Sequence, residues 1–285
     1  MSIEPAPPFT PDLDAYFQRI GDSGPRQPTL AALNRIIAAH VRTIPFENLD
    51  ILLGRPISIS PKQIEQKLVH DRRGGYCFEQ NGLMFQILQA LGYTVHALSA
   101  RVRIQRPREF TPARTHQFLR VELDGQFWIV DVGVGGLSPT AALALVLDES
   151  QPTPHEPRRI IAVGDWTNLD QRAPDALLYH QVQLNGHWED VCEFTLEAMH
   201  PIDQELANWY TSAHPNSHFR NLLTVARATD TGRVTLLNRV LKHRKADGSS
   251  QTCTLNSDDA LLAALKQEFG LNFPADTVFN CEGLH

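Results

Sequence analysis

The sequence predicts an α+β fold in which a helical segment comes first, an antiparallel sheet or small barrel second, and a mixed α/β segment last. Three observations lead to this prediction. Apolar residues recur at helical spacing over the first ninety residues, they form strand-like runs from residue 94 onward, and both periods return in the last third. We therefore divide the chain of 285 residues into segments 1–93, 94–197 and 198–285.

The first two helices are expected at 13–20 and 30–41, where apolar residues fall on one face. Gly21 is the expected C-cap of the first helix, and Thr29 is the expected N-cap of the second. The second helix should end before Pro45, because the residue that precedes a proline is disfavoured in helical conformation.

Two more helices are expected before residue 94. The third opens at Ser60, with Pro61 at its first position and Gln63 placed to complete a capping box. The fourth begins at Cys77, carries apolar residues on one side and stops at Gly92.

The second segment reads as strands separated by turns, including the hairpin signal Asp124-Gly125 and a proline-rich stretch at 148–159. Two helices are expected in the last segment, at 200–213 and at 258–269 before Gly270. The strand-like runs are 96–104, 116–123, 126–132, 158–163, 177–184 and 233–243.

Composition excludes several classes of function. The net charge of −6 and the lack of a basic cluster argue against nucleic-acid binding. No secretion signal or membrane-spanning run is visible, so we expect a cytoplasmic protein without a membrane partner. The four cysteines (Cys77, Cys192, Cys253 and Cys281) are widely spread, which favours neither disulfides nor a metal site.

Cys77 stands out because of its position. It follows the Gly74-Gly75 pair and opens a helix, where the positive end of the helix dipole and free backbone N–H groups favour a thiolate. The two glycines are expected to leave room beside the sulfur for a substrate carbonyl. A buried apolar role is the alternative interpretation of a lone cysteine.

A nucleophilic thiol needs a base and a group that orients the base. A two-residue turn at Asp124-Gly125 places His116 opposite Gly133 and puts Asp131 on the same face as a diagonal neighbour, about 7–8 Å away at Cα. An aspartate inside an apolar strand also requires a buried partner. The hairpin therefore predicts a pair between His116 and Asp131.

Five blocks, in this order along nearly the whole chain, resemble the arylamine N-acetyltransferase family in its bacterial form. The blocks are IPFENLDI (44–51), RGGYCFEQN (73–81), the Thr115-His116 strand, DVGVGG (131–136) and NWYTSAHPNSHF (208–219). The resemblance implies a helical bundle, a central antiparallel β-barrel and a C-terminal α/β lid around a cysteine-protease-like catalytic core.

The resemblance also implies a reaction. In that family a Cys-His-Asp triad, matched here by Cys77, His116 and Asp131, takes an acetyl group from acetyl-CoA. The triad passes it by a ping-pong route to an arylamine, N-hydroxyarylamine or arylhydrazine. No metal is implied.

Further positions follow from the resemblance. Phe46, Val102, Val134 and Phe219 match positions that line the acceptor pocket, and Thr115 lies where the pantetheine thioester has to pass. Val134 departs from the family, whose block usually reads DVGFGG.

We also expect Arg73 to meet Glu47 and Asn48 and so hold the nucleophile loop to the helical segment. Three alternative functions stay open at this point: a Cys-His-Asp hydrolase, an amide synthase of macrolactam biosynthesis, and a binding module with an inert Cys77. The sequence also leaves open the oligomeric state, a homodimer included, the physiological amine, and whether the cell uses the activity for xenobiotic metabolism or for biosynthesis.

Overall fold

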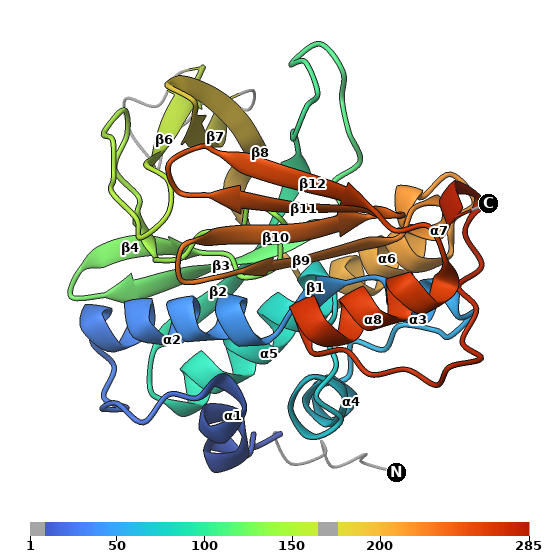
Figure 1. Cartoon of the computed structure of the whole chain (residues 1–285). Coiled ribbons are helices and arrows are strands. Elements are labelled where there is room, and N and C mark those ends of the chain that lie inside the picture. The colour runs from blue at the N-terminus through green and yellow to red at the C-terminus, as the bar shows by residue number, and fades with distance from the viewer. Residues whose placement is uncertain (1–8, 165–175, 285) are drawn as a thin grey trace.

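The computed structural model describes residues 9–164 and 176–284. Figure 1 shows helices α1, α2, α4 and α5 gathered at one end of the molecule and strands β6–β8 at the other. The sheet that contains strands β9–β12 lies between them in this view. The helices of the first segment are α1 (Leu13–Ile20), α2 (Leu30–Thr43), α3 (Leu49–Leu52), α4 (Pro61–Glu65) with its π-helical continuation η1 (Gln66–His70), and α5 (Cys77–Ala90).

The expected helix boundaries are largely confirmed. The hydroxyl of Thr29 caps α2, and Gly21 ends α1 in the left-handed conformation. The capping box predicted at Ser60 is wrong, because the Ser60 N–H donates to Ser58 Oγ at 3.1 Å and no side chain caps α4. Helix α5 ends at Ala90, two residues before Gly92.

The antiparallel sheet predicted from residue 94 onward has seven strands in the order β5-β4-β3-β2-β8-β7-β6. The turn Asp124-Gly125 has positive φ at both residues, 52° and 75°, as a type I′ hairpin requires. Pairing of Leu119 with Val130 confirms the predicted register. The strands are β2 (Thr94–Val102), β3 (His116–Leu123), β4 (Gln126–Val130), β5 (Leu143–Ala144), β6 (Arg158–Val163), β7 (Leu177–Leu184) and β8 (His187–Ala198).

This sheet curls into a nearly closed barrel. Its edge strands β5 and β6 are bridged by Gln151, whose Nε2 donates to the carbonyl of Ala144 at 2.9 Å. The N–H of Gln151 donates to the carbonyl of Arg158 at 2.7 Å. The alternation of strand β3 explains the placement of its residues, since Leu119 and Val121 pack against the helices while Phe118 belongs to the barrel core.

A second, five-stranded sheet has the order β1-β9-β10-β11-β12. Its edge strand β1 comes from the block IPFENLDI, which sequence patterning did not predict as a strand. The run 233–243 forms two strands joined at Asn238 and Arg239, because Leu237 pairs with Val240. The remaining elements are β1 (Phe46–Glu47), β9 (Thr224–Ala228), β10 (Gly232–Leu237), β11 (Val240–Lys245), β12 (Ser250–Thr254), α6 (Pro201–Ala213), α7 (His218–Asn221), α8 (Asp258–Phe269) and the 3₁₀ turn η2 (Glu282–Leu284).

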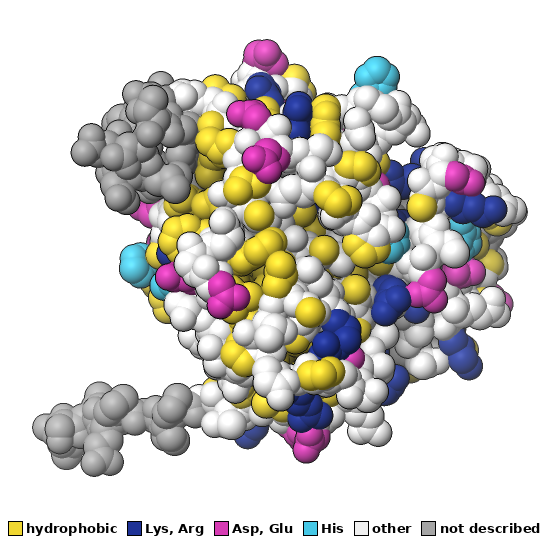
Figure 2. Space-filling view, turned by 90° about the vertical axis from the view of Figure 1, so that its left-hand side faces the viewer, with side chains coloured by type: hydrophobic (Ala, Val, Ile, Leu, Met, Phe, Trp, Pro, Cys, Tyr) yellow, Lys and Arg dark blue, Asp and Glu magenta, His cyan; other side chains and the backbone are white. Residues whose placement is uncertain are grey.

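The surface in Figure 2 mixes acidic, basic and apolar side chains, and no single sign of charge dominates the coloured part of that face. Among the helices that the structure describes, none is long and apolar enough to cross a membrane.

Candidate active site

Cys77 is the first residue of α5 and is buried, with 4% of its surface exposed. Its thiol donates to the backbone carbonyl of Thr115 at 3.6 Å, so the loop before β3 lies directly over the sulfur. The Glu79 carboxylate accepts from the Tyr76 N–H at 3.0 Å and fixes the first turn of the helix. Thr115 therefore lies beside the nucleophile through its backbone carbonyl, and its contact with the pantetheine thioester stays a prediction.

The Gly74-Gly75 pair allows close packing of the nucleophile loop against its neighbours. A Cβ at Gly74 would lie 2.1 Å from the carbonyl oxygen of Pro45, and one at Gly75 would lie 2.7 Å from the Glu79 carboxylate. A further close approach comes from Gly133, where a Cβ would lie 2.7 Å from the Cα of Cys77. The backbone that follows β4 therefore packs directly on the nucleophile.

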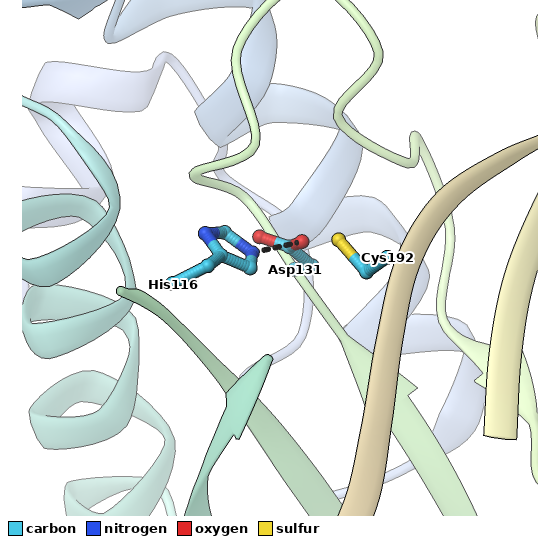
Figure 3. Close-up of side chains that lie close together, drawn as sticks. All are labelled: His116, Asp131 and Cys192. Carbon is cyan, nitrogen blue, oxygen red and sulfur yellow. Dashed lines mark hydrogen bonds and ion pairs between the residues drawn. The ribbon is translucent and has the colours of Figure 1, made fainter. Parts of the chain in front are cut away.

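The predicted pair between His116 and Asp131 is present, with His116 Nε2 2.7 Å from Asp131 Oδ2 (Figure 3). The second carboxylate oxygen, Oδ1, accepts from Asn81 Nδ2 at 3.0 Å and from the Gly133 N–H at 2.9 Å. The other ring nitrogen of His116 points away from Asp131 (Figure 3), and the Cys77 side chain also interacts with the ring. The three groups thus stand in the order sulfur, imidazole, carboxylate.

The electrostatics of this site favour an imidazolium. Burial would lower the pKa of His116, but the Asp131 carboxylate and the Cys77 sulfur raise that pKa to about 10. Burial would also raise the pKa of Asp131, but His116, Asn81 and the Gly133 N–H keep it below its usual range. At neutral pH, His116 is therefore protonated and Asp131 ionised.

Two buried amides in the block RGGYCFEQN support the site, and sequence reasoning missed both. Gln80 donates to the carbonyls of Pro45 (2.8 Å) and Gly75 (3.2 Å), and its Oε1 lies 2.6 Å from His40 Nε2. Asn81 accepts from the Val132 N–H at 3.0 Å, besides its bond to the triad carboxylate. The sequence signal that could have identified them is the adjacent pair Gln80-Asn81 in the first turns of a mostly apolar, buried helix.

An ion-pair network lies beneath the nucleophile loop. Arg73 binds Glu47 at 2.7 Å and Asp50 at 3.2 Å, as predicted for Glu47. Lys67 joins Asp50, at 2.8 Å, to Glu79, at 2.7 Å. The loop that carries Cys77 is therefore tied to α3 and η1 by buried charges.

The expected contact of Asn48 with Arg73 is wrong. Asn48 Nδ2 donates to the carbonyls of Phe219 and Leu222, both at 2.7 Å, and Oδ1 accepts from the Thr224 N–H at 2.9 Å. Its backbone follows strand β1, so its side chain fastens the segment around α7 to the second sheet.

Substitution Arg73→Met should destabilise the fold by about 3–5 kcal/mol, because it leaves the fully buried side chain of Glu47 without its cation. The measurement is the free energy of unfolding in urea. Arg72→Met is the matched control, since Arg72 is the exposed neighbour. A loss no greater than that of the control would contradict a stabilising role for the network.

The four predicted pocket residues lie in two clusters on either side of the triad. Phe46 and Phe219 pack together, with ring centroids 6.0 Å apart, in the cluster that contains Cys77. Val102 and Val134 belong to the barrel cluster with Phe118. The predicted pocket residues are thus divided between the cluster around Cys77 and the core of the barrel.

Comparison with known proteins agrees with this geometry. A family model described as N-acetyltransferase matches residues 29–278. An arylamine N-acetyltransferase of Mycobacterium tuberculosis is 42% identical over 265 residues, which cover 92% of this chain and 89% of the relative. That of Escherichia coli is 38% identical over 264 residues, with 92% and 90% coverage.

Solved structures show the same fold. The M. tuberculosis enzyme superposes with a TM-score of 0.84 at 40% identity, covering 92% of this chain and 94% of that one. The Mycobacterium marinum enzyme in complex with CoA superposes with a TM-score of 0.83 at 36% identity, with 91% and 92% coverage. By family model, sequence identity and fold, the chain belongs to the arylamine N-acetyltransferase family.

Proposed function

We propose that this enzyme moves an acetyl group from acetyl-CoA to an arylamine, N-hydroxyarylamine or arylhydrazine through an acetyl-Cys77 intermediate. The observation that carries the proposal is the order of Cys77, His116 and Asp131 at the start of a helix in a chain of this family. A CoA complex of a relative supports the donor, and the names of the relatives support the acceptor class.

In the first half-reaction the Cys77 thiolate, paired with protonated His116, attacks the thioester carbonyl. The Cys77 N–H, at the first helical position, has no intrahelical acceptor and suits the developing oxyanion. A new carbon–sulfur bond forms, the bond to the CoA sulfur breaks, and His116 gives its proton to the leaving thiolate. Exchange of one thioester for another is nearly isoenergetic, which suits a cysteine.

In the second half-reaction the amine attacks the acetyl-enzyme. The acetylated sulfur carries no charge, so His116 loses one of the two partners that raise its pKa and keeps only Asp131. It can then accept a proton from the attacking nitrogen while the bond to Cys77 breaks. Asp131 keeps the ring oriented through both steps.

Residues beside Thr115 support a path for the donor. Arg114 on the same loop is partly exposed, and its Nη1 lies 3.6 Å from an exposed carboxylate of Glu197. Arg106 lies near His218, which precedes the pocket residue Phe219. Cations at this entrance suit the phosphates of a CoA thioester, and Thr115 would contact the pantetheine.

Intact mass measurement after incubation with acetyl-CoA tests the proposal. A single acetyl adduct should form and should disappear when an arylamine is added. Release of acetate to water at the same rate without amine would identify a hydrolase, and failure to form an adduct would contradict the mechanism.

Val134 is expected to set donor size. The position is buried in the same cluster as Phe118. The Phe118 ring packs edge-on against Phe194, with ring centroids 5.0 Å apart, and the Phe219 ring packs on Phe46. Neither ring is therefore free to replace the aromatic side chain that is usual in the family. Propionyl-CoA should therefore be used with kcat/KM comparable to that of acetyl-CoA. Val134→Phe should shift preference toward acetyl by about tenfold or more, because a methylene in an apolar pocket contributes ~1–3 kcal/mol.

The measurement is kcat/KM for both donors with one fixed arylamine. An acetyl-to-propionyl ratio that is the same in wild type and Val134→Phe would show that this position does not select the donor. Val163→Phe, at a partly exposed valine of β6, is the matched control and should leave the ratio unchanged.

A further inference from the structure

A row of buried polar side chains crosses the barrel behind the triad. Cys192 on β8 places its sulfur within 4.8 Å of a nitrogen of His116 and an oxygen of Asp131, on the far side of the carboxylate from the ring (Figure 3). His180 on β7 pairs with Cys192 across the sheet. His180 Nε2 in turn lies 3.0 Å from Nη1 of Arg158 on β6.

Arg158 is fully buried and is incompletely neutralised by its local partner. Its Nη2 lies 3.3 Å from Glu156, but Arg233 holds both oxygens of that carboxylate at 2.8 and 2.7 Å, and Arg244 binds it at 2.6 Å. The Nε of Arg158 has no hydrogen-bond partner among the described residues. The single carboxylate of Glu156 thus forms ion pairs with three guanidinium groups. Of these, the guanidinium group of Arg158 has no access to solvent.

The groups between Arg158 and the triad are uncharged. Burial and the neighbouring guanidinium lower the pKa of His180 to about 3, so this imidazole stays neutral. Burial raises the pKa of Cys192 well above its usual value, so it stays a thiol. Burial and Arg233 lower the pKa of Arg158 to about 9, so it stays charged at neutral pH, and Asp131 is among the groups that stabilise this charge. Across this part of the barrel, the nearest counter-charge for Arg158 besides Glu156 is therefore the triad carboxylate.

The triad itself carries a negative charge when it is reactive. Cys77 as thiolate, His116 as imidazolium and Asp131 as carboxylate sum to −1, and one further proton brings the sum to zero. A buried cation nearby favours the negative form. The buried partners of the triad on the other side, Asn81 and the Gly133 N–H, are uncharged.

We propose that Arg158 is a positioning residue for acetyl transfer, whose buried charge acts through the barrel to hold the triad in its reactive, singly negative form. It touches neither substrate nor sulfur. This role rests on the proposed Cys77 triad and adds to it a residue on β6 that sets the acidic limit of activity.

The test is the pH dependence of Cys77 alkylation by iodoacetamide, followed by mass mapping of the Cys77 peptide. Arg158→Met should move the half-maximal rate to higher pH by about 0.5–1 unit, as loss of a screened charge across the barrel would give. Arg158→Lys should shift the midpoint by no more than Arg158→Met does, because burial and Arg233 also lower the pKa of a lysine at this site and weaken its charge. Arg159→Met is the matched control, since Arg159 is partly exposed, binds Gln181 and lies over Trp188.

A purely structural role would lower the fraction of active protein without moving the midpoint. An unchanged midpoint in Arg158→Met would overturn the proposal. Glu156→Gln provides a second, opposite test if Arg158→Met does not fold, because removal of the carboxylate strengthens the positive field and should move the midpoint to lower pH. Since alkylation needs no acetyl-CoA, failure of acetyl transfer would leave this result interpretable.

Discussion

Replacing Cys77 by alanine is expected to abolish both the acetyl adduct and arylamine turnover, a loss of about 10⁴-fold or more in kcat. The physical reason is that the proposed acyl-enzyme needs a sulfur at the start of α5, beside His116 and the free N–H groups of the helix. Adduct formation is measured by intact mass, and turnover by the rate of CoA release.

The other cysteines are the controls. Cys253 is exposed, and the thiol of Cys281 donates a hydrogen bond to the carbonyl of Asn221 at 3.0 Å. Cys253→Ala and Cys281→Ala should therefore keep activity to within a few fold. Cys192 is the informative competitor because it borders the same His116-Asp131 pair. Burial raises its pKa, so it should not be acetylated, and Cys192→Ala should also remain active within a few fold. An adduct that persists in Cys77→Ala and maps to Cys192 would contradict the mechanism.

The triad geometry could be predicted because it depends on local features. A two-residue turn fixes the register of β3 and β4, and the register alone decides that His116 and Asp131 share a face. The start of a helix at Cys77 follows from the periodicity of its apolar residues. Neither step required contacts between distant parts of the chain.

The supporting contacts could not be predicted, because they join residues that are remote in sequence. Asn81 reaches Asp131 across 50 positions, and Asn48 reaches the segment near Phe219 across 171. Strand β1 has only two residues and owes its extended form to pairing with β9, which lies far along the chain. The burial of Arg158 likewise depends on how β6 packs against the other strands. The strand-like run 158–163 does not indicate which of its side chains face the interior of the barrel.

The surroundings of Asp131 determine what an amide would do in its place. Oδ1 receives two donors, Asn81 Nδ2 and the Gly133 N–H, so that position must stay an oxygen. In Asp131→Asn the amide NH₂ must then occupy the position that faces His116 Nε2. The ring has to present an acceptor there, which places its proton on the nitrogen that faces Cys77.

Asp131→Asn should therefore lower kcat by ~10³–10⁴-fold while the protein stays folded, because a neutral His116 with its proton on the sulfur side cannot accept one from Cys77. Loss of the carboxylate also removes the charge that raises the His116 pKa, so burial pulls that pKa down and the imidazolium is lost at neutral pH. The measurements are kcat, the rate of Cys77 alkylation at pH 7 and the melting temperature. Asp124→Asn is the matched control: it makes the same chemical change in the same hairpin, at a turn residue with φ 52° where asparagine is well tolerated, and it should leave all three unchanged. Alkylation of Asp131→Asn at the wild-type rate would mean that the carboxylate does not set the protonation of His116.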